Sequence, residues 1–166
     1  MYTKMYKGLH SMKNIHCELL FIRHYRFKKK ILVDYTAIQM YNLVKDIEDY
    51  ENYLPWCNKS KLVEKNDTFS LYQVNVGFPP LYDEYISKVI FDPFKSIHST
   101  YLVGSRYLNK NECNWIFTQK GNKCETSVNI EYQFSHKLST IFSIPLAQFV
   151  SQNIMKSFID RAKKIY

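Results

Sequence analysis

The residues of this chain that could perform acid–base or nucleophilic chemistry are scattered. His98 falls in an expected strand and His136 in an expected turn, and neither belongs to a Ser-His-Asp order or a metal triad. Acidic residues cluster at 46–51 and 83–84, with a spacing that indicates a solvated face. General acid–base catalysis needs positioned groups with tuned pKa values, and no glycine-rich phosphate loop is present. The sequence therefore disfavours an enzyme.

The cysteines do not form a metal-binding or disulfide pattern. None of them sits in a CxxC pair, and no histidine lies at zinc-finger spacing from them. A chain of 166 residues is large enough to fold without disulfides. We expect no metal site and four isolated reduced thiols, at Cys17, Cys57, Cys113 and Cys124.

Length and composition indicate one domain with a packed interior. Hydrophobic residues make up 46% of the chain and aromatic residues 16%. No apolar run reaches the roughly 18–20 residues that a membrane-spanning helix needs, which predicts a soluble or peripheral protein. The net charge of +8 is concentrated in residues 1–30, which carry eight basic side chains and one acidic one. Because the rest of the chain is close to neutral, no nucleic-acid partner is expected.

The first residues have the composition of a targeting segment. Residues 1–21 are basic and nearly free of acids, and they lack the long apolar region of a secretion signal. They are also compatible with a disordered basic tail. The expected division is a targeting or disordered segment at 1–21 and a folded domain at 22–166.

The body of the chain reads as a strand, two short helices, about six strands and a long helix. Thr36 is a plausible N-cap for the first helix, and Pro55 forces an extended exit after the second. Period-two alternation is strictest at 126–134, where every second residue is apolar. The final helix is expected from Leu138 to Tyr166, with Pro145 either kinking it or starting a second helix. The expected strands cover 22–33, 59–65, 69–78, 85–91, 97–103, 111–119 and 126–134.

This order predicts an α+β fold in which a curved antiparallel sheet wraps around the C-terminal helix. A long helix across a concave sheet need not fill the space beneath it. A cavity there would be apolar, with few polar groups. From composition alone, however, aromatic stripes on strands are more typical of a filled core.

Several motifs resemble those of a known family, and this resemblance favours a ligand cavity over a filled core. Residues 41–57 end in Leu54-Pro55-Trp56-Cys57, and Val76-Gly77-Phe78, Tyr85-x-Ser87-x-Val89 and Trp115-x-Phe117 follow in the strands. The late strands and the final helix add Glu131-Tyr132-x-Phe134, Phe158, Arg161-Ala162 and Tyr166. On these motifs, residues 22–166 resemble the coenzyme Q-binding START-domain family. This family belongs to the START-like, helix-grip, polyketide cyclase/dehydrase superfamily. The chain departs from the family pattern at Pro145, Gln148 and Phe149.

The resemblance implies a non-catalytic protein that binds ubiquinone or a polyprenylated quinone precursor. Such a protein acts as a lipid chaperone for mitochondrial respiration and ubiquinone biosynthesis, without a catalytic cofactor. It lies peripherally on the matrix side of the inner membrane, with quinone-synthesis proteins as candidate partners. The superfamily also includes a ribosome-binding bacterial toxin and polyketide cyclase-like enzymes, which remain as alternatives.

The expected ligand contacts are the side chains on the inner faces of the strands and the final helix. Tyrosines 72, 85, 101 and 132 are candidate hydrogen-bonding groups for the polar head. The expected ligand-binding residues are Tyr72, Val74, Val76, Phe78, Tyr85, Val89, Tyr101, Trp115, Phe117, Ile130, Tyr132, Phe142, Leu146, Phe149, Val150 and Ile154. Membrane contact is expected at Pro80, Leu81 and Phe149.

Overall fold

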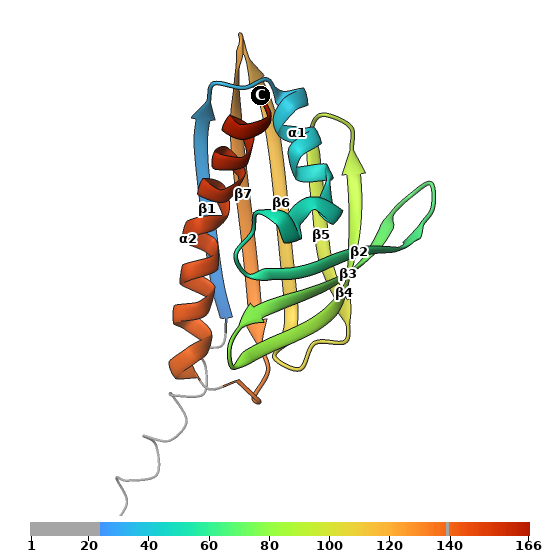
Figure 1. Ribbon diagram of the computed structural model, residues 1–166, viewed down its shortest axis with the longest axis vertical. Coiled ribbons are helices and arrows are strands. Elements are labelled where there is room, and N and C mark those ends of the chain that lie inside the picture. Colours follow the sequence, from blue (N-terminus) through green and yellow to red (C-terminus); the bar gives the residue numbers. More distant parts are fainter. Residues whose placement is uncertain (1–23, 139) are drawn as a thin grey trace, which may run out of the picture.

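The protein is built on one antiparallel sheet whose concave side holds the helices (Figure 1). The computed structural model describes residues 24–138 and 140–166, where the sheet has seven strands in the order β1-β7-β6-β5-β4-β3-β2. The elements are β1 (His24–Val33), α1 (Ala37–Lys45), η2 (Ile47–Asn52), β2 (Cys57–Lys65), β3 (Ser70–Phe78), β4 (Leu81–Asp92), β5 (Ser96–Val103), β6 (Leu108–Lys120), β7 (Lys123–Phe134) and α2 (Thr140–Ile165).

The strands follow the alternation that the sequence predicts. In β7, Val128, Ile130 and Phe134 are buried, and Ile130 lies opposite both Phe27 of β1 and Cys113 of β6. A register in which apolar residues face apolar residues fixes which side of the sheet turns inward. The α+β helix-grip fold predicted from the sequence is confirmed.

Helix α1 begins where the sequence places its cap. The Gln39 backbone N–H donates to Thr36 Oγ1 at 3.2 Å, and the Thr36 N–H donates to Gln39 Oε1 at 2.8 Å. This reciprocal capping box satisfies two donors that would otherwise have no helical partner. The helix buries Met40, Leu43 and Val44 against the core.

Helix α2 runs as one element through Pro145. It spans 26 residues, and Pro145 is its sixth. The alternative of a second helix starting at Pro145 is therefore wrong. At this position, beyond the first turn, proline cannot donate the usual N–H bond to the carbonyl four residues earlier, so packing of the helix must offset that loss.

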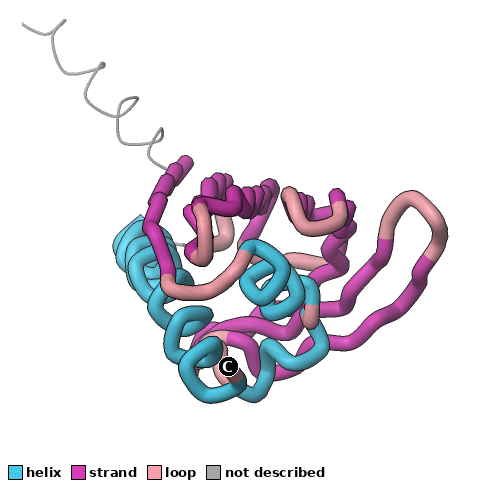
Figure 2. Tube along the Cα trace, turned by 90° about the horizontal axis from the view of Figure 1, so that it is seen from above, coloured by secondary structure: helices cyan, strands magenta, loops and turns pink. Residues whose placement is uncertain are grey.

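The sheet curves around the helices in a second view (Figure 2). Helix α2 contacts β1, β7 and α1, and α1 contacts β5, β6 and β7. The 3₁₀ helix η2 packs against edge strand β2 instead. This arrangement leaves α2 and η2 facing the middle of the concave surface. The predicted targeting segment at 1–21 lies outside the described residues.

Candidate functional site

A cavity of about 200 Å³ lies between α2, η2 and the concave face of the sheet. Its inner end is formed by buried apolar side chains of the strands, including Val89, Ile97 and Ile130. Phe158 of α2 closes this end, with its ring 4.9 Å from that of Trp115. Most of the lining is therefore hydrocarbon, as in sites for apolar ligands.

The lining residues become more exposed toward the β3–β4 turn and the N-terminal half of α2. Phe78, Leu81, Leu146 and Val150 are half-buried, whereas the inner end is fully buried. The cavity therefore opens between this turn and this helix. Gly77, at the same place, has φ +131°, and an added Cβ would lie 2.1 Å from the Leu81 carbonyl oxygen. Only glycine fits there, because any side chain would collide with the backbone of β4.

Phe149 covers part of this opening. Its ring packs edge-on against Phe78 at 5.4 Å and against Trp56 at 6.4 Å. These contacts join α2 to β3 and to the segment after η2. Because 44% of Phe149 remains exposed, it lies at the boundary between cavity and solvent.

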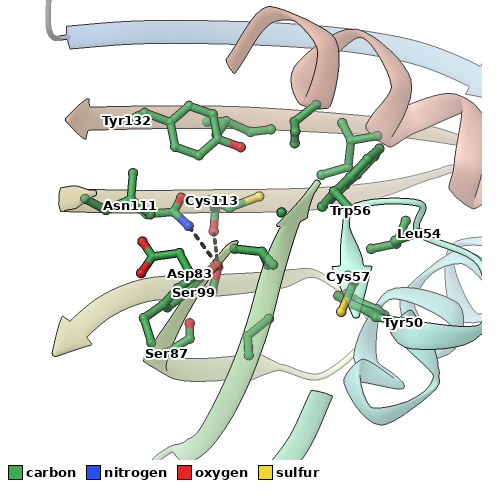
Figure 3. Close-up of a pocket in the computed structure, with 18 of the residues that line it drawn as sticks. Tyr50, Leu54, Trp56, Cys57, Asp83, Ser87, Ser99, Asn111, Cys113 and Tyr132 are labelled. Carbon is green, nitrogen blue, oxygen red and sulfur yellow. Dashed lines mark hydrogen bonds between the residues drawn. The ribbon is translucent and has the colours of Figure 1, made fainter. Parts of the chain in front are cut away.

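Polar groups of the lining gather along the middle of the sheet, on β4, β5, β6 and β7 (Figure 3). Asn111 Nδ2 donates to Tyr85 Oη at 3.1 Å, and Ser99 Oγ donates to the Cys113 carbonyl oxygen at 3.5 Å. Tyr132 lies directly opposite Asn111 in the β6–β7 register. A belt of hydrogen-bonding groups thus crosses an otherwise apolar wall.

Asp83 lines the cavity, but its carboxylate is fully engaged by the β5–β6 loop. It accepts the Arg106 backbone N–H at 2.9 Å, the Tyr107 N–H at 3.2 Å and the hydroxyl of Ser105. The expectation of a solvated Asp83 was wrong, because the loop folds back over the carboxylate. Asp83 anchors this loop.

The acidic cluster at 46–51 is also not simply solvated. Glu51 and Glu48 accept backbone N–H groups of β2, from Ser60 at 3.1 Å and Leu62 at 3.3 Å. Asp49 pairs with Arg161 of α2 at 2.8 Å. These carboxylates attach η2 to the sheet edge and to the last helix.

Burial keeps cysteines and tyrosines of the cavity neutral. It raises the pKa of the Cys57 thiol to about 11 and that of Cys113 to about 12. It also raises the pKa of Tyr85 and Tyr132 well above the ordinary tyrosine value. A low-dielectric site disfavours the charged form of each group. At neutral pH these cysteines and tyrosines are therefore thiols and phenols.

Twelve of the sixteen residues expected to bind ligand line this cavity. They come from four strands, β3, β4, β6 and β7, and from α2, which meet only in the folded protein. These residues are Tyr72, Val74, Val76, Phe78, Tyr85, Val89, Trp115, Ile130, Tyr132, Leu146, Val150 and Ile154. Leu81, expected at the membrane, also lines the cavity, whereas Pro80 is exposed.

The other four residues lie outside the lining for separate reasons. Phe117 is buried beyond Trp115, with its ring against Tyr41. Tyr101 lies opposite Ser87 on the concave face, but its ring packs against Tyr85 at 6.0 Å. Phe142 is 58% exposed on α2. Phe149 sits over the opening, as described above.

Sequence reasoning missed the contribution of η2 and the segment after it. Ile47, Tyr50, Leu54, Trp56 and Cys57 all line the cavity. The motif that ends in Cys57 carries the family resemblance, but its spacing does not predict which of its side chains face the cavity. Asn111 was also missed, although it alternates with Cys113 and Trp115 on one strand.

The described part of the chain offers neither a metal centre nor a membrane span. No group of three or more His, Cys, Asp or Glu side chains in it is placed to bind a metal ion. None of its helices is long and apolar enough to cross a bilayer.

The fold places the protein in the START-like, helix-grip class. A START superfamily protein from Mycobacterium smegmatis has a TM-score of 0.73 at 14% identity, covering 85% of this chain and 99% of that one. The Zhui aromatase/cyclase from Streptomyces sp. R1128 has a TM-score of 0.75 at 12% identity, covering 85% and 94%. At these identities the likeness establishes the fold alone.

The chain belongs to the family described as polyketide cyclase / dehydrase and lipid transport, which matches residues 33–161. The Xenopus laevis coenzyme Q-binding protein COQ10 homolog B, mitochondrial, is 23% identical over 157 residues, which cover 92% of this chain and 64% of the relative. The chain thus spans less than two thirds of the frog protein's length. The Vibrio cholerae ribosome association toxin RatA is 24% identical over 139 residues, 83% of this chain and 95% of the relative.

Proposed function

We propose that this protein is a non-catalytic carrier of ubiquinone or a polyprenylated quinone precursor. The observation that carries the proposal is an apolar cavity crossed by one belt of neutral hydrogen-bonding groups. A prenyl chain is stabilised there because each buried CH₂-sized unit contributes about 0.8 kcal/mol. The name of the frog relative supports a quinone as the lipid.

The size of the cavity favours partial enclosure of the lipid. Its volume of about 200 Å³ is below the roughly 300–1,000 Å³ of pockets that enclose a drug-sized ligand. The head group and first prenyl units would occupy the interior. The remaining chain would leave through the opening beside α2, toward a membrane or along the protein surface.

A carrier role, rather than catalysis, is supported by the charge of the lining. Asp83 is the one carboxylate among the described lining residues, and the β5–β6 loop holds it. His98 is placed away from the cavity, since it alternates with the inward-facing Ile97 and Ser99. Among the described lining residues, therefore, no acid–base pair faces the space that the proposed ligand would occupy.

Delivery of the lipid would use the apolar surface around the opening. The first turns of α2 expose Ile141 (76%), Phe142 (58%) and Phe149 (44%), and Pro80 is exposed in the β3–β4 turn. An exposed apolar patch of this kind is typical of a membrane or protein interface. We place the protein on the matrix side of the mitochondrial inner membrane, where quinone-synthesis proteins are candidate partners.

Vesicle binding tests this surface. Replacing Phe142 and Phe149 with Glu should abolish sedimentation with phosphatidylcholine vesicles. Ile116→Glu is the matched control, because Ile116 is 45% exposed on β6 beside the inward-facing Trp115. Equal sedimentation of both variants would reject the surface.

Ribosome association is the second candidate, and the match to the Vibrio cholerae toxin favours it. The experiment that decides is lipid extraction from the purified protein followed by mass spectrometry, together with ribosome sedimentation of the same preparation. Co-purified quinone or prenyl lipid supports the carrier. Absence of such a lipid, no saturable uptake of a short-chain ubiquinone and co-sedimentation with ribosomes would overturn it.

A further inference from the structure

Two polar side chains, Tyr85 of β4 and Asn111 of β6, meet across β5 inside the cavity. Asn111 Nδ2 donates to Tyr85 Oη at 3.1 Å, and both residues line the cavity. The strand between them, β5, contributes Tyr101, whose ring supports the Tyr85 ring at 6.0 Å. The pair is therefore held in place from the sheet side.

This hydrogen bond uses only part of what the two groups offer. In the described structure Asn111 is the sole hydrogen-bond partner of Tyr85 Oη. The Tyr85 O–H proton and Asn111 Oδ1 are both left for a ligand. If the amide is turned the other way, its NH₂ group becomes the free donor instead. Either orientation leaves a donor and an acceptor facing the cavity.

Apolar side chains surround this pair, so a hydrogen-bond donor left without an acceptor there is energetically unfavourable. Val74 lies opposite Tyr85 on β3, and Val89 and Ile97 line the wall toward the inner end. A buried polar group without a partner loses its hydration without compensation. Burial also raises the pKa of the Tyr85 phenol, so the group keeps its proton at neutral pH and remains a donor.

We propose that Tyr85 and Asn111 form the head-group subsite of the cavity and hydrogen-bond a carbonyl oxygen on the ring of a quinone. The proposal rests on the lipid-carrier function above and specifies where the head group lies. A quinone carbonyl oxygen accepts a hydrogen bond from the free donor, which is either the Tyr85 O–H or the Asn111 NH₂ group. In the reduced form of the head group, a ring hydroxyl donates to Asn111 Oδ1, so one pair of side chains serves both redox states. The prenyl chain then extends past Leu146 and Phe78 toward the opening.

Binding of two matched ligands tests the subsite. The probes are a ubiquinone with two isoprene units and a benzene ring carrying the same prenyl chain without oxygen atoms. The chain has two tryptophans, Trp56 and Trp115, and both line the cavity. Their fluorescence reports quinone binding, and displacement of the quinone reports binding of the hydrocarbon.

Tyr85→Phe should weaken quinone binding by about three- to tenfold and change hydrocarbon binding by less than about twofold. Asn111→Leu should show the same selectivity. Tyr101→Phe is the matched control, since its ring touches Tyr85 but does not line the cavity. It should leave both affinities unchanged, and circular dichroism of each variant checks the fold.

The outcomes separate the subsite from the carrier function. Wild-type protein that binds hydrocarbon and quinone equally well, or variants that bind quinone like wild type, would overturn the subsite and leave lipid binding intact. Wild-type protein that binds neither probe would overturn both proposals. Loss of quinone affinity in Tyr101→Phe equal to that in Tyr85→Phe would also overturn the subsite, because the effect would then come from packing.

Discussion

Phe149 connects three parts of the molecule with a single ring. Trp56 follows η2, Phe78 ends β3, and Phe149 lies in the third turn of α2. Edge-to-face aromatic pairs contribute about 0.5–1.5 kcal/mol each beyond the area they bury. The proposed lipid would have to disturb these contacts to leave beside α2, so we expect Phe149 to control the rate of exchange.

Phe149→Ala should therefore release a bound short-chain ubiquinone faster, by roughly tenfold if two such contacts are lost in part. Stopped-flow tryptophan fluorescence, with excess unlabelled lipid vesicles as acceptor, measures the release rate. Ile116→Ala is the control, because it removes an exposed apolar side chain from β6, outside the surface proposed to meet the membrane. Identical release rates in the two variants would show that Phe149 does not close the opening.

At the scale of elements, the last helix is fastened to η2 by a charged pair. Arg161 Nη2 lies 2.8 Å from Asp49 Oδ2, and its guanidinium lies 5.5 Å from the Tyr53 ring centre. Both charged side chains are mostly shielded from water. Removing one partner of a shielded pair costs more than removing an exposed one, because the other charge loses its compensation.

Arg161→Ala should lower the free energy of unfolding by about 1–2 kcal/mol, between the values for exposed and fully buried pairs. Lys163→Ala removes the exposed pair with Asp160 and should cost less than about 0.5 kcal/mol. Urea unfolding of both variants gives the comparison. An equal loss in the free energy of unfolding in both variants would mean that the Arg161–Asp49 pair stabilises the protein no more than an exposed ion pair does.

The free edge of β2 depends on two carboxylates of η2. Glu51 and Glu48 accept the backbone N–H groups of Ser60 and Leu62, which would otherwise be open to pairing with another chain. Replacing both glutamates with Ala should promote association of the folded protein. Light scattering at rising concentration measures it, with Glu64→Ala on the same strand as control. A monodisperse double variant would contradict this role.

The sequence predicted elements better than it predicted how they meet. Alternation located β7, and the Thr36 cap located α1, because both signals are local. The lining from η2 could not be predicted, since it depends on how that helix is turned by Asp49 and Arg161, which are far apart in sequence. Tyr101 lies outside the lining because its ring packs against Tyr85 of the neighbouring strand, a contact that alternation along one strand does not reveal. The continuity of α2 through Pro145 likewise depends on packing that periodicity does not contain.

At the scale of the whole molecule, the interior combines a cavity with many protonated thiols and phenols. Burial raises the pKa of Cys57 to about 11 and that of Cys113 to about 12, and it raises the pKa values of Tyr85 and Tyr132 well above the ordinary tyrosine value. In the unfolded chain these groups return to ordinary values, 9.0 for cysteine and 10.0 for tyrosine. Their protons are thus held more tightly by the folded state.

This difference makes the folded protein sensitive to alkali. Above pH 9 the unfolded state binds fewer protons than the folded one, so stability falls as pH rises. The contribution of Cys113 is complete below pH 9 and is lost between 9 and about 12, at up to about 1.4 kcal/mol per pH unit. Urea midpoints should hold between pH 6 and 8 and fall steeply beyond 9. Cys113→Ser removes this titration, so its decline above pH 9 should be shallower than that of the wild type. Parallel declines would mean that the Cys113 thiol is not buried in a water-poor cavity, and the apolar character of the site would then be in question.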